Sequence, residues 1–353
     1  MGQEDSPELP VIPVVKQPAG IRYYLGTWSG RILVINFIVF AWMVFQQPSS
    51  LWIPSVEYVR EFGSKSLSDI ALGEYWRFIS PVFVHIGIIH FFFNAMAMYY
   101  IGYQIEYILG AKWFLIVYLT AGIVGNLASC VFSLAPSAGA SGALFGLLGA
   151  GFRLEGLLSD AFDRQGIAKK PRRKIYSGLV VTNIILGLII PVIDNSAHLG
   201  GLISGWLLTE AMLRTKPNRL RQQNKILAYA IYFAVFTFAV GSIASSSNKK
   251  WVVRRYTEAG MKADSAPEAY ADFTEALRVS PMDPKARMYR GQLLLQAGET
   301  DRGVEDLKLA ISTGQITDAD FDRVVENLEM TGHRLEAELA RKLKEDARND
   351  QGI

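Results

Sequence analysis

Cysteine is almost absent from this chain of 353 residues. The single Cys130 lies inside an apolar stretch, which excludes an intrachain disulfide and a metal site built from several cysteines. The first thirty residues lack the basic, apolar and small-residue order of a cleaved signal peptide. They are rich in proline and acidic at their start, so we expect residues 1–30 to form a loosely ordered cytoplasmic leader.

Charge is scarce between about residues 31 and 245. Half of the chain is hydrophobic (50%) and 20% is charged. Within 31–245 the charges fall mainly in short connections, whereas residues 249–353 are rich in Lys, Arg, Asp and Glu. A globular enzyme mixes hydrophobic and charged residues along its whole length. The split therefore predicts an all-α fold, with a polytopic membrane helix bundle at 31–248 and a water-soluble helical domain at 249–353.

Seven apolar stretches are close to the ~20 residues that a helix needs to cross the hydrocarbon core. They are 31–47, 79–103, 113–133, 141–158, 173–193, 197–213 and 225–245. Two connections carry clusters of basic residues and should be cytoplasmic: Lys169, Lys170, Arg172, Arg173 and Lys174 in one, and Arg214, Lys216, Arg219 and Arg221 in the other. This predicts a cytoplasmic amino terminus and an external carboxyl-terminal domain. Four basic residues just after the seventh stretch run against that orientation: Lys249, Lys250, Arg254 and Arg255.

The fourth and sixth stretches each begin with a reactive side chain. Ser141 lies in the sequence GASG, and His198 lies in AHLGGLISGW. Both stretches start on the outer side in the predicted orientation, so the hydroxyl and the imidazole fall in the same half of the membrane. An imidazole that removes the hydroxyl proton makes serine a nucleophile toward an amide carbonyl. Because no carboxylate lies at comparable depth on another stretch, the pair predicts a catalytic dyad of a protease.

Two polar side chains on the second stretch are candidates for oxyanion stabilisation. His90 and Asn94 are four residues apart, which places them on one face of a helix. They lie about midway along an otherwise apolar stretch, where unsatisfied polar groups are costly. The Ser141 N–H at a helix start adds a third donor. Such a donor contributes on the order of 3 kcal/mol in characterised hydrolases.

These features also have purely structural interpretations. Glycines four apart, such as Gly142 with Gly146 and Gly201 with Gly205, are typical of helix packing. Buried serine, histidine and asparagine side chains often bond to their own or a neighbouring helix. Arg77, beside Trp76, is interpreted as an interfacial anchor. Glu106 is interpreted as a structural cap or a loop tie.

A metal site is the other chemical alternative, built from His85, His90 and His198. His85 and His90 are five residues apart, which is about 140° around a helix, so the two rings do not converge easily. No carboxylate joins them. We therefore predict neither a metal nor a cofactor.

Taken together, the motifs resemble those of the rhomboid intramembrane serine proteases over roughly residues 70–215. GEYWR at 73–77 resembles the Trp-Arg loop motif of that family, and His90 with Asn94 matches its H-x-x-x-N motif. Gly102, Glu106 and Gly110 follow at spacings of four. GASG at 139–142 matches the nucleophile motif, and AHLGG at 197–201 matches the base motif.

The resemblance implies a core of six transmembrane helices, with 225–245 as an added seventh. It implies Ser141 as nucleophile, His198 as base, and His90, Asn94 and the Ser141 amide as the oxyanion site. Gly201 would allow the two reactive helices to approach closely, and Gly139 and Gly142 flank the nucleophile. Many members of the family have tyrosine four residues after the serine; Phe145 here keeps an aromatic face for stacking on the histidine. The implied substrates are transmembrane proteins, cut near the outer boundary at small residues in helix-destabilising sequence.

Residues 251–346 show a self-similarity of 34 residues. Four positions recur in order: Ala269, Phe273, Ala276 and Pro281 correspond to Gly303, Leu307, Ala310 and Gln315. The pattern resembles tetratricopeptide repeats, with two readable units and a degenerate third at about 318–346. It predicts a domain that binds a peptide or protein partner, and a helical cap without a partner is the alternative.

The predicted function is intramembrane serine endopeptidase, in a multi-pass protein of a bacterial plasma (inner) membrane. The alternative is a rhomboid-like pseudoprotease that binds transmembrane clients without cutting them. Such relatives lose the serine or the histidine, and this chain keeps both. A transporter or channel needs polar residues that track through the bilayer, whereas here they cluster in the outer half. The expected partners are transmembrane substrates and the lipid bilayer, and no nucleic acid.

Overall fold

The computed structural model describes residues 20–164, 175–190, 193–215 and 225–350. These residues form helices joined by turns and contain no strand, so the predicted all-α fold is confirmed. The predicted leader at residues 1–19 and most of the two basic connections lie outside the described residues. The chain divides into two units: unit 1 is Met1–Ser66 with Tyr75–Ile243, and unit 2 is Leu67–Glu74 with Ala244–Ile353.

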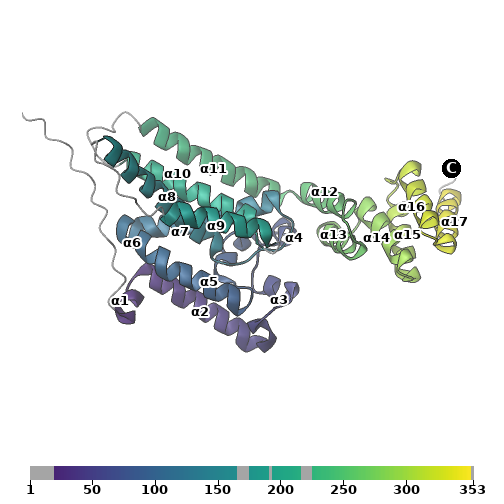
Figure 1. Ribbon diagram of the computed structural model, residues 1–353. Coiled ribbons are helices and arrows are strands. Elements are labelled where there is room, and N and C mark those ends of the chain that lie inside the picture. The colour runs from purple at the N-terminus through teal and green to yellow at the C-terminus, as the bar shows by residue number, and fades with distance from the viewer. Residues whose placement is uncertain (1–19, 165–174, 191–192, 216–224, 351–353) are drawn as a thin grey trace, which may run out of the picture. The chain divides into compact units, whose positions relative to one another are not determined.

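Unit 1 is a bundle of long helices joined by short helical turns (Figure 1). Its amino-terminal part contains α1 (Ile21–Leu25), α2 (Trp28–Gln46), η1 (Pro48–Leu51), α3 (Val56–Glu61), η2 (Tyr75–Phe78) and η3 (Ser80–Phe83). The remaining elements are α5 (Gly87–Ala97), the π-helical turn η4 (Met98–Gly102), α6 (Tyr103–Leu109), α7 (Ala111–Phe132), α8 (Ser141–Arg164), α9 (Ile175–Ile189), α10 (Asn195–Thr215) and α11 (Lys225–Ser247).

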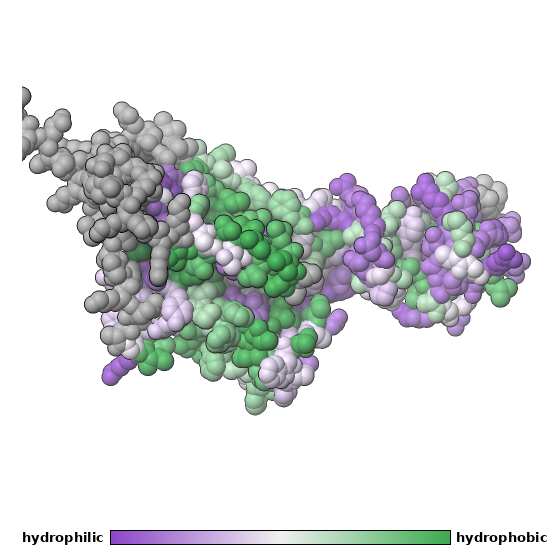
Figure 2. Space-filling model, viewed as in Figure 1, coloured by the Kyte–Doolittle hydropathy of each residue, from purple (hydrophilic) through white to green (hydrophobic). Residues whose placement is uncertain are grey.

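Three helices in the described part of the chain are long and apolar enough to cross a bilayer: Trp28–Gln46, Ala111–Phe132 and Ala230–Ser247. The apolar helix α9 is shorter. Figure 2 shows hydrophobic residues over much of the visible surface of the helices of unit 1. The chain is therefore a membrane protein. The other predicted crossings fall on α5 with α6, on α8 and on α10, and the total of seven stays a prediction.

The second predicted crossing begins later in the chain than expected. Residues 79–86 form η3 and an irregular turn, and the helix starts only at Gly87. Gly87 has φ +77°, and a Cβ there would lie 2.1 Å from the carbonyl oxygen of Trp52. Pro81 lies within the short turn η3. The predicted start at residue 79 is therefore wrong, and the helical run instead extends through η4 to Leu109.

The helices α7, α8 and α10 pack closely together in the core of unit 1. Helix α7 is mostly buried, and its Phe114 and Tyr118 have no exposed surface. Helices α8 and α10 approach each other through glycine: a Cβ on Gly201 would lie 2.0 Å from the carbonyl oxygen of Gly142. Only glycine allows backbones to come this close. The contact brings the start of α8 beside the first two turns of α10.

Unit 2 consists of α4 (Leu67–Ala71), α12 (Lys249–Gly260), α13 (Ala266–Val279), α14 (Pro284–Gln296), α15 (Thr300–Ser312), α16 (Asp318–Met330) and α17 (Arg334–Asp350). Helices α13, α15 and α17 begin at residues 266, 300 and 334, so they recur at the 34-residue period of the sequence. The corresponding side chains of Phe273 and Leu307 are both buried. The tetratricopeptide relationship itself stays a prediction.

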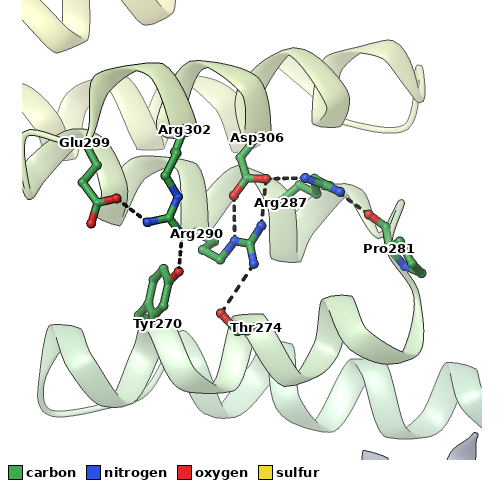
Figure 3. Close-up of polar contacts among 8 residues, drawn as sticks. All are labelled: Tyr270, Thr274, Pro281, Arg287, Arg290, Glu299, Arg302 and Asp306. Carbon is green, nitrogen blue, oxygen red and sulfur yellow. Dashed lines mark hydrogen bonds and ion pairs between the residues drawn. The ribbon is translucent and has the colours of Figure 1, made fainter.

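A buried carboxylate ties three successive helices of unit 2 together (Figure 3). Asp306 of α15 has a side chain that is 3% exposed, and it pairs with Arg287 and Arg290 of α14. Arg290 Nε donates to Asp306 at 2.7 Å, and its Nη1 reaches the hydroxyl of Thr274 on α13 at 3.5 Å. Because both guanidinium groups pair with Asp306, the buried carboxylate is not left unpaired.

The short segment 67–74 packs with the carboxyl-terminal helices. Within unit 2, α4 contacts α12 and α13. Arg278 donates to the buried Asp69 at 2.9 Å, and the hydroxyl of Ser68 donates to Glu275. A piece of the connection between the first two predicted crossings is therefore a structural part of the carboxyl-terminal domain.

Candidate active site

Ser141 is the first residue of α8, and a constrained glycine turn leads into it. Gly139 has φ +130°, a conformation that L side chains rarely adopt. Its N–H donates to the carbonyl oxygen of Pro81 at 2.8 Å. A Cβ at Gly139 would lie 2.5 Å from Cε1 of His90, so the turn is pressed against that ring. The predicted nucleophile therefore stands at a helix amino terminus, next to one of the predicted oxyanion residues.

His198, in the first turn of α10, reaches Ser141 directly. The distance between His198 Nε2 and Ser141 Oγ is 2.8 Å, so the hydroxyl can donate to the ring when Nδ1 carries the ring proton. His198 Nδ1 is buried and has no hydrogen-bond partner among the described residues. A nucleophile and a base within hydrogen-bond reach are the two parts that the chemistry of a serine hydrolase requires.

Phe145 fixes the plane of the His198 ring. The two rings are stacked, with centroids 4.0 Å apart and planes 14° apart. Phe145 lies one helical turn after Ser141 on α8 and is buried. The stacking expected from the aromatic residue at this position is therefore present, and it does not need a tyrosine hydroxyl.

His90 and Asn94 lie in different local environments. The backbone N–H of Ile86 donates to His90 Nδ1 at 3.2 Å, which leaves Nε2 to carry the proton of a neutral ring. That Nε2 is on the edge that faces Gly139. Asn94 is buried, and its amide donates to the carbonyl oxygen of His90 at 2.9 Å. The structure thus brings His90 to the nucleophile turn, whereas this Asn94 proton is directed at its own helix.

Asp194 is a residue of the site that the sequence analysis missed. Its carboxylate accepts hydrogen bonds from the Ala197 N–H at 3.0 Å and from the hydroxyls of Ser196 and Ser129 at 2.5 Å each. Burial raises the pKa of Asp194, but these hydrogen bonds and the charge of Lys65 outweigh burial and hold the pKa below its ordinary value. The carboxylate caps α10 and does not hydrogen-bond to the buried Nδ1 of His198. The available signal was an aspartate just before a helix start, which is typical of an N-cap.

Two charged residues that the sequence analysis singled out have structural roles. Arg77 is buried, and its Nη1 donates to the carbonyl oxygens of Arg60 at 2.7 Å and Ser64 at 2.8 Å. Its interpretation as an interfacial anchor is therefore wrong, because the guanidinium satisfies buried carbonyls. Glu106 accepts from the N–H groups of Trp28 and Ser29 at 2.8 Å each, so its interpretation as a cap is confirmed.

The metal alternative can be compared with the positions of its histidines. The rings of His85 and His90 have centroids 5.5 Å apart, closer than expected from their spacing on a helix. The expectation was wrong because His85 precedes the start of α5. His85 Nδ1 lies 3.2 Å from the carbonyl oxygen of Phe83. Among the described residues, no group of three or more histidine, cysteine or acidic side chains could hold a metal ion.

A small cavity of about 60 Å³ lies beside His198. It is lined by residues of α8, α9 and α10: Phe145, Asn183, Ile184, Leu188, Asn195, His198 and Leu199. The amide of Asn195 donates to the carbonyl oxygen of Gly187 at 2.7 Å, which joins the end of α9 to the start of α10. The cavity has room for a small apolar side chain next to the base.

The chain is similar to known proteins over the segment that carries these residues. Residues 72–215 match the family model described as the Rhomboid domain. The chain is 33% identical over 261 residues to Rhomboid protease GluP of Bacillus subtilis (strain 168), an alignment that covers 73% of this chain and 49% of GluP. It is 31% identical over 192 residues to Putative rhomboid protease YdcA of the same organism, covering 53% of this chain and 92% of YdcA. It is 39% identical over 160 residues to RHOMBOID-like protein 7 of Arabidopsis thaliana, covering 44% of this chain and 49% of that protein.

The chain thus spans about half the length of GluP and nearly the whole of YdcA. The matched segment contains Ser141, His198, His90 and Asn94. This chain is a member of the rhomboid family of membrane proteins.

Proposed function

We propose that the protein is an intramembrane serine endopeptidase that cleaves transmembrane proteins with a Ser141–His198 dyad. The observation that carries the proposal is the 2.8 Å contact between His198 Nε2 and Ser141 Oγ. Family membership alone supports a protease of this class, because relatives of the chain are named as rhomboid proteases. The pairing of Ser141 with His198 adds the specific chemistry of a serine nucleophile and a histidine base.

In the proposed reaction, His198 Nε2 takes the hydroxyl proton as Ser141 Oγ bonds to the peptide carbonyl carbon. The carbonyl oxygen becomes an oxyanion, for which the Ser141 N–H at the start of α8 and the Nε2–H of His90 are donors. When the peptide C–N bond breaks, His198 returns the proton to the leaving nitrogen. Water then attacks the acyl ester by the same proton transfers and releases Ser141.

Asn94 is proposed as the third oxyanion donor, on the condition that its side chain rotates away from its present partner. Its amide is bonded to the His90 carbonyl in the substrate-free protein. A rotation of the side chain upon substrate binding would supply the donor, as hydrogen bonds of catalytic sites often tighten only in the complex. This makes Asn94 a contributor to turnover rather than to substrate affinity.

The proposed substrate is a transmembrane segment with a small residue at the cut site. The cavity beside His198 is small and mostly apolar, which suits such a side chain. In the predicted orientation both reactive residues lie at the outer ends of their helices, so the cut would fall near the outer membrane boundary.

The proposed location is the plasma (inner) membrane of a bacterium, with a cytoplasmic amino terminus and an external carboxyl-terminal domain. Support for the external position comes from α4, which lies between the first and second predicted crossings and packs with α13 inside unit 2. Two segments that pack together lie on the same side of a membrane. One predicted crossing precedes α4 and seven precede α13. Both numbers are odd, so from a cytoplasmic amino terminus both helices lie on the external side. The helical pairs of unit 2 are proposed to bind a peptide or protein partner.

A fluorophosphonate probe, which reacts with activated serines, tests the dyad in detergent-solubilised protein. Labelling of the wild type should be lost in Ser141→Ala and in His198→Ala. In proteoliposomes with a transmembrane reporter substrate, both variants should still bind the reporter but not cleave it. Asn94→Ala should lower kcat by at least tenfold with little change in KM. Cleavage by Ser141→Ala would refute the mechanism, and a folded wild type that binds the reporter without labelling or cleavage would favour the non-cleaving alternative.

A further inference from the structure

Two charged side chains with no role in the proposed reaction lie where the chain approaches the reactive helices. Lys65 has no exposed surface, although lysine is almost never fully buried unless it is paired. Asp194 immediately precedes α10, which carries His198. Lys65 holds the segment that leads to Ser141, and Asp194 holds the start of the helix that carries His198.

Lys65 holds the segment that leads to the nucleophile. Its ammonium donates to the carbonyl oxygens of Ser133 at 3.0 Å and Ala135 at 2.6 Å. Its backbone also pairs with Ser137 in both directions, with N–O distances of 2.7 and 3.2 Å. Residues 133–137 are therefore fixed to Lys65 by main chain and side chain, four residues before Ser141.

Asp194 holds the segment that carries the base. Its carboxylate accepts from the Ala197 N–H, and its backbone carbonyl accepts from the His198 N–H at 3.1 Å. Both bonds set the first turn of α10, and with it the direction in which the His198 side chain leaves the helix. The Ser129 hydroxyl of α7 ties the same carboxylate to the neighbouring helix.

The two anchors meet at the carboxyl end of α7. Ser129, which bonds Asp194, is one helical turn before Ser133, whose carbonyl receives the Lys65 ammonium. The Lys65 charge also acts on the Asp194 carboxylate. The carboxyl end of α7 therefore connects the segment that leads to Ser141 with the start of α10, which carries His198.

We infer that Lys65 and Asp194 are positioning residues: they anchor, at the end of α7, the two segments that bring the nucleophile turn and the base helix to hydrogen-bonding distance. This inference rests on the proposed protease function. Neither residue is a catalytic residue, because each acts through the backbone that carries Ser141 or His198. Lys65→Met removes the hydrogen bonds to Ser133 and Ala135, and Asp194→Asn weakens the cap of α10, so each change loosens the backbone that leads to one half of the dyad.

Four variants test the pair in full-length protein reconstituted into proteoliposomes with a transmembrane reporter substrate. Lys65→Met keeps the length of the side chain without its charge, and Asp194→Asn keeps the shape of the cap. The other two are the double variant and Ser129→Ala. Lys112→Met and Asp264→Asn are matched controls, because both side chains are exposed and distant in sequence from the site.

Each single neutralisation should lower kcat about 100-fold, the effect of a misplacement of about 1 Å, with KM within twofold of the wild type. The double variant should be close to the weaker single variant, because either change alone already displaces one half of the same Ser141–His198 contact. Ser129→Ala should lower kcat several-fold with an unchanged unfolding temperature, which separates positioning from folding. The controls should match the wild type.

Hydrogen exchange provides a readout that does not need activity. Backbone amides of residues 133–140 should exchange faster in Lys65→Met, and those of the first turn of α10 should exchange faster in Asp194→Asn. Losses of kcat that multiply in the double variant, or unchanged kcat and exchange in folded single variants, would overturn the inference. If the wild type fails to cleave the reporter while hydrogen exchange of the variants changes as described, the proposed function is overturned and the positioning role is not.

Discussion

Adding one methyl group at Gly201 should separate the two reactive side chains. The Cβ of alanine would lie 2.0 Å from the carbonyl oxygen of Gly142, about 1.4 Å short of the 3.4 Å at which ordinary contact begins. Because Gly142 follows Ser141 and Gly201 is three residues after His198, moving α8 and α10 apart by this amount lengthens the 2.8 Å contact to about 4 Å. That distance is no longer a hydrogen bond. We expect Gly201→Ala to lower kcat at least 100-fold and to cost about 1–3 kcal/mol of stability through overpacking.

Two comparison variants separate lost geometry from lost stability. Gly205→Ala meets the carbonyl oxygen of Gly146 at the same 2.0 Å, but it lies further along α10 from the dyad. Gly241→Ala in α11 meets no atom within 4 Å. The assays are thermal unfolding, fluorophosphonate labelling and reporter cleavage. Gly201→Ala should lose more activity than Gly205→Ala at similar stability, and Gly241→Ala should match the wild type. Full activity of folded Gly201→Ala would refute the reasoning.

Three further changes have defined outcomes. Burial and two neighbouring glutamates raise the pKa of Asp272 in α13 to about 6, so its stabilising contribution is present below the unfolded value of 3.8 and is lost as the pH rises through 6. Asp272→Asn should therefore raise the opening free energy of α13 by about 1 kcal/mol at pH 7.5, after allowance for solvent screening, and slow its hydrogen exchange accordingly. Near pH 4 the substitution should have no effect. Glu210→Gln leaves the partly buried Arg153 guanidinium without its carboxylate partner and should cost about 3 kcal/mol in thermal unfolding, with partial recovery when Arg153 is also changed to Met. Phe145→Leu removes the ring that stacks on His198 and should lower kcat about tenfold, an effect on the order of 1 kcal/mol, whereas Phe145→Tyr should retain activity.

The residues that sequence reasoning identified are those whose signal is local. Ser141, His198 and Phe145 stand at fixed offsets in short motifs, and the structure places all three side chains in contact. Glu106 was recognisable as a cap from its position at the end of an apolar helix. The 34-residue period likewise repeats a local pattern of small and bulky residues, and the helices of unit 2 begin at the same period.

The residues that were missed or misread depend on contacts between distant segments. Lys65 reads as an ordinary surface lysine, and only its pairing with residues 133–137 shows that it is buried. Arg77 looked like a membrane anchor because its carbonyl partners, some 13 and 17 residues earlier, cannot be inferred from the local pattern. For His85, the error came from assuming a helix where a glycine with positive φ delays its start. No periodicity in the sequence reports such close approaches.

The membership of α4 in unit 2 has a consequence for the order in which the protein is made. Asp69 and its partner Arg278 are 209 residues apart, so the ribosome completes every predicted membrane crossing before the carboxyl-terminal helix that packs on α4 exists. The bundle must then insert with one of its early connections still lacking its packing partner, and such long-range contacts form late. A nascent or truncated chain that ends before α13 therefore carries an intact dyad sequence but an unfinished segment 67–74. Proteolytic sensitivity in that short segment would then mark chains whose carboxyl-terminal domain has not yet folded.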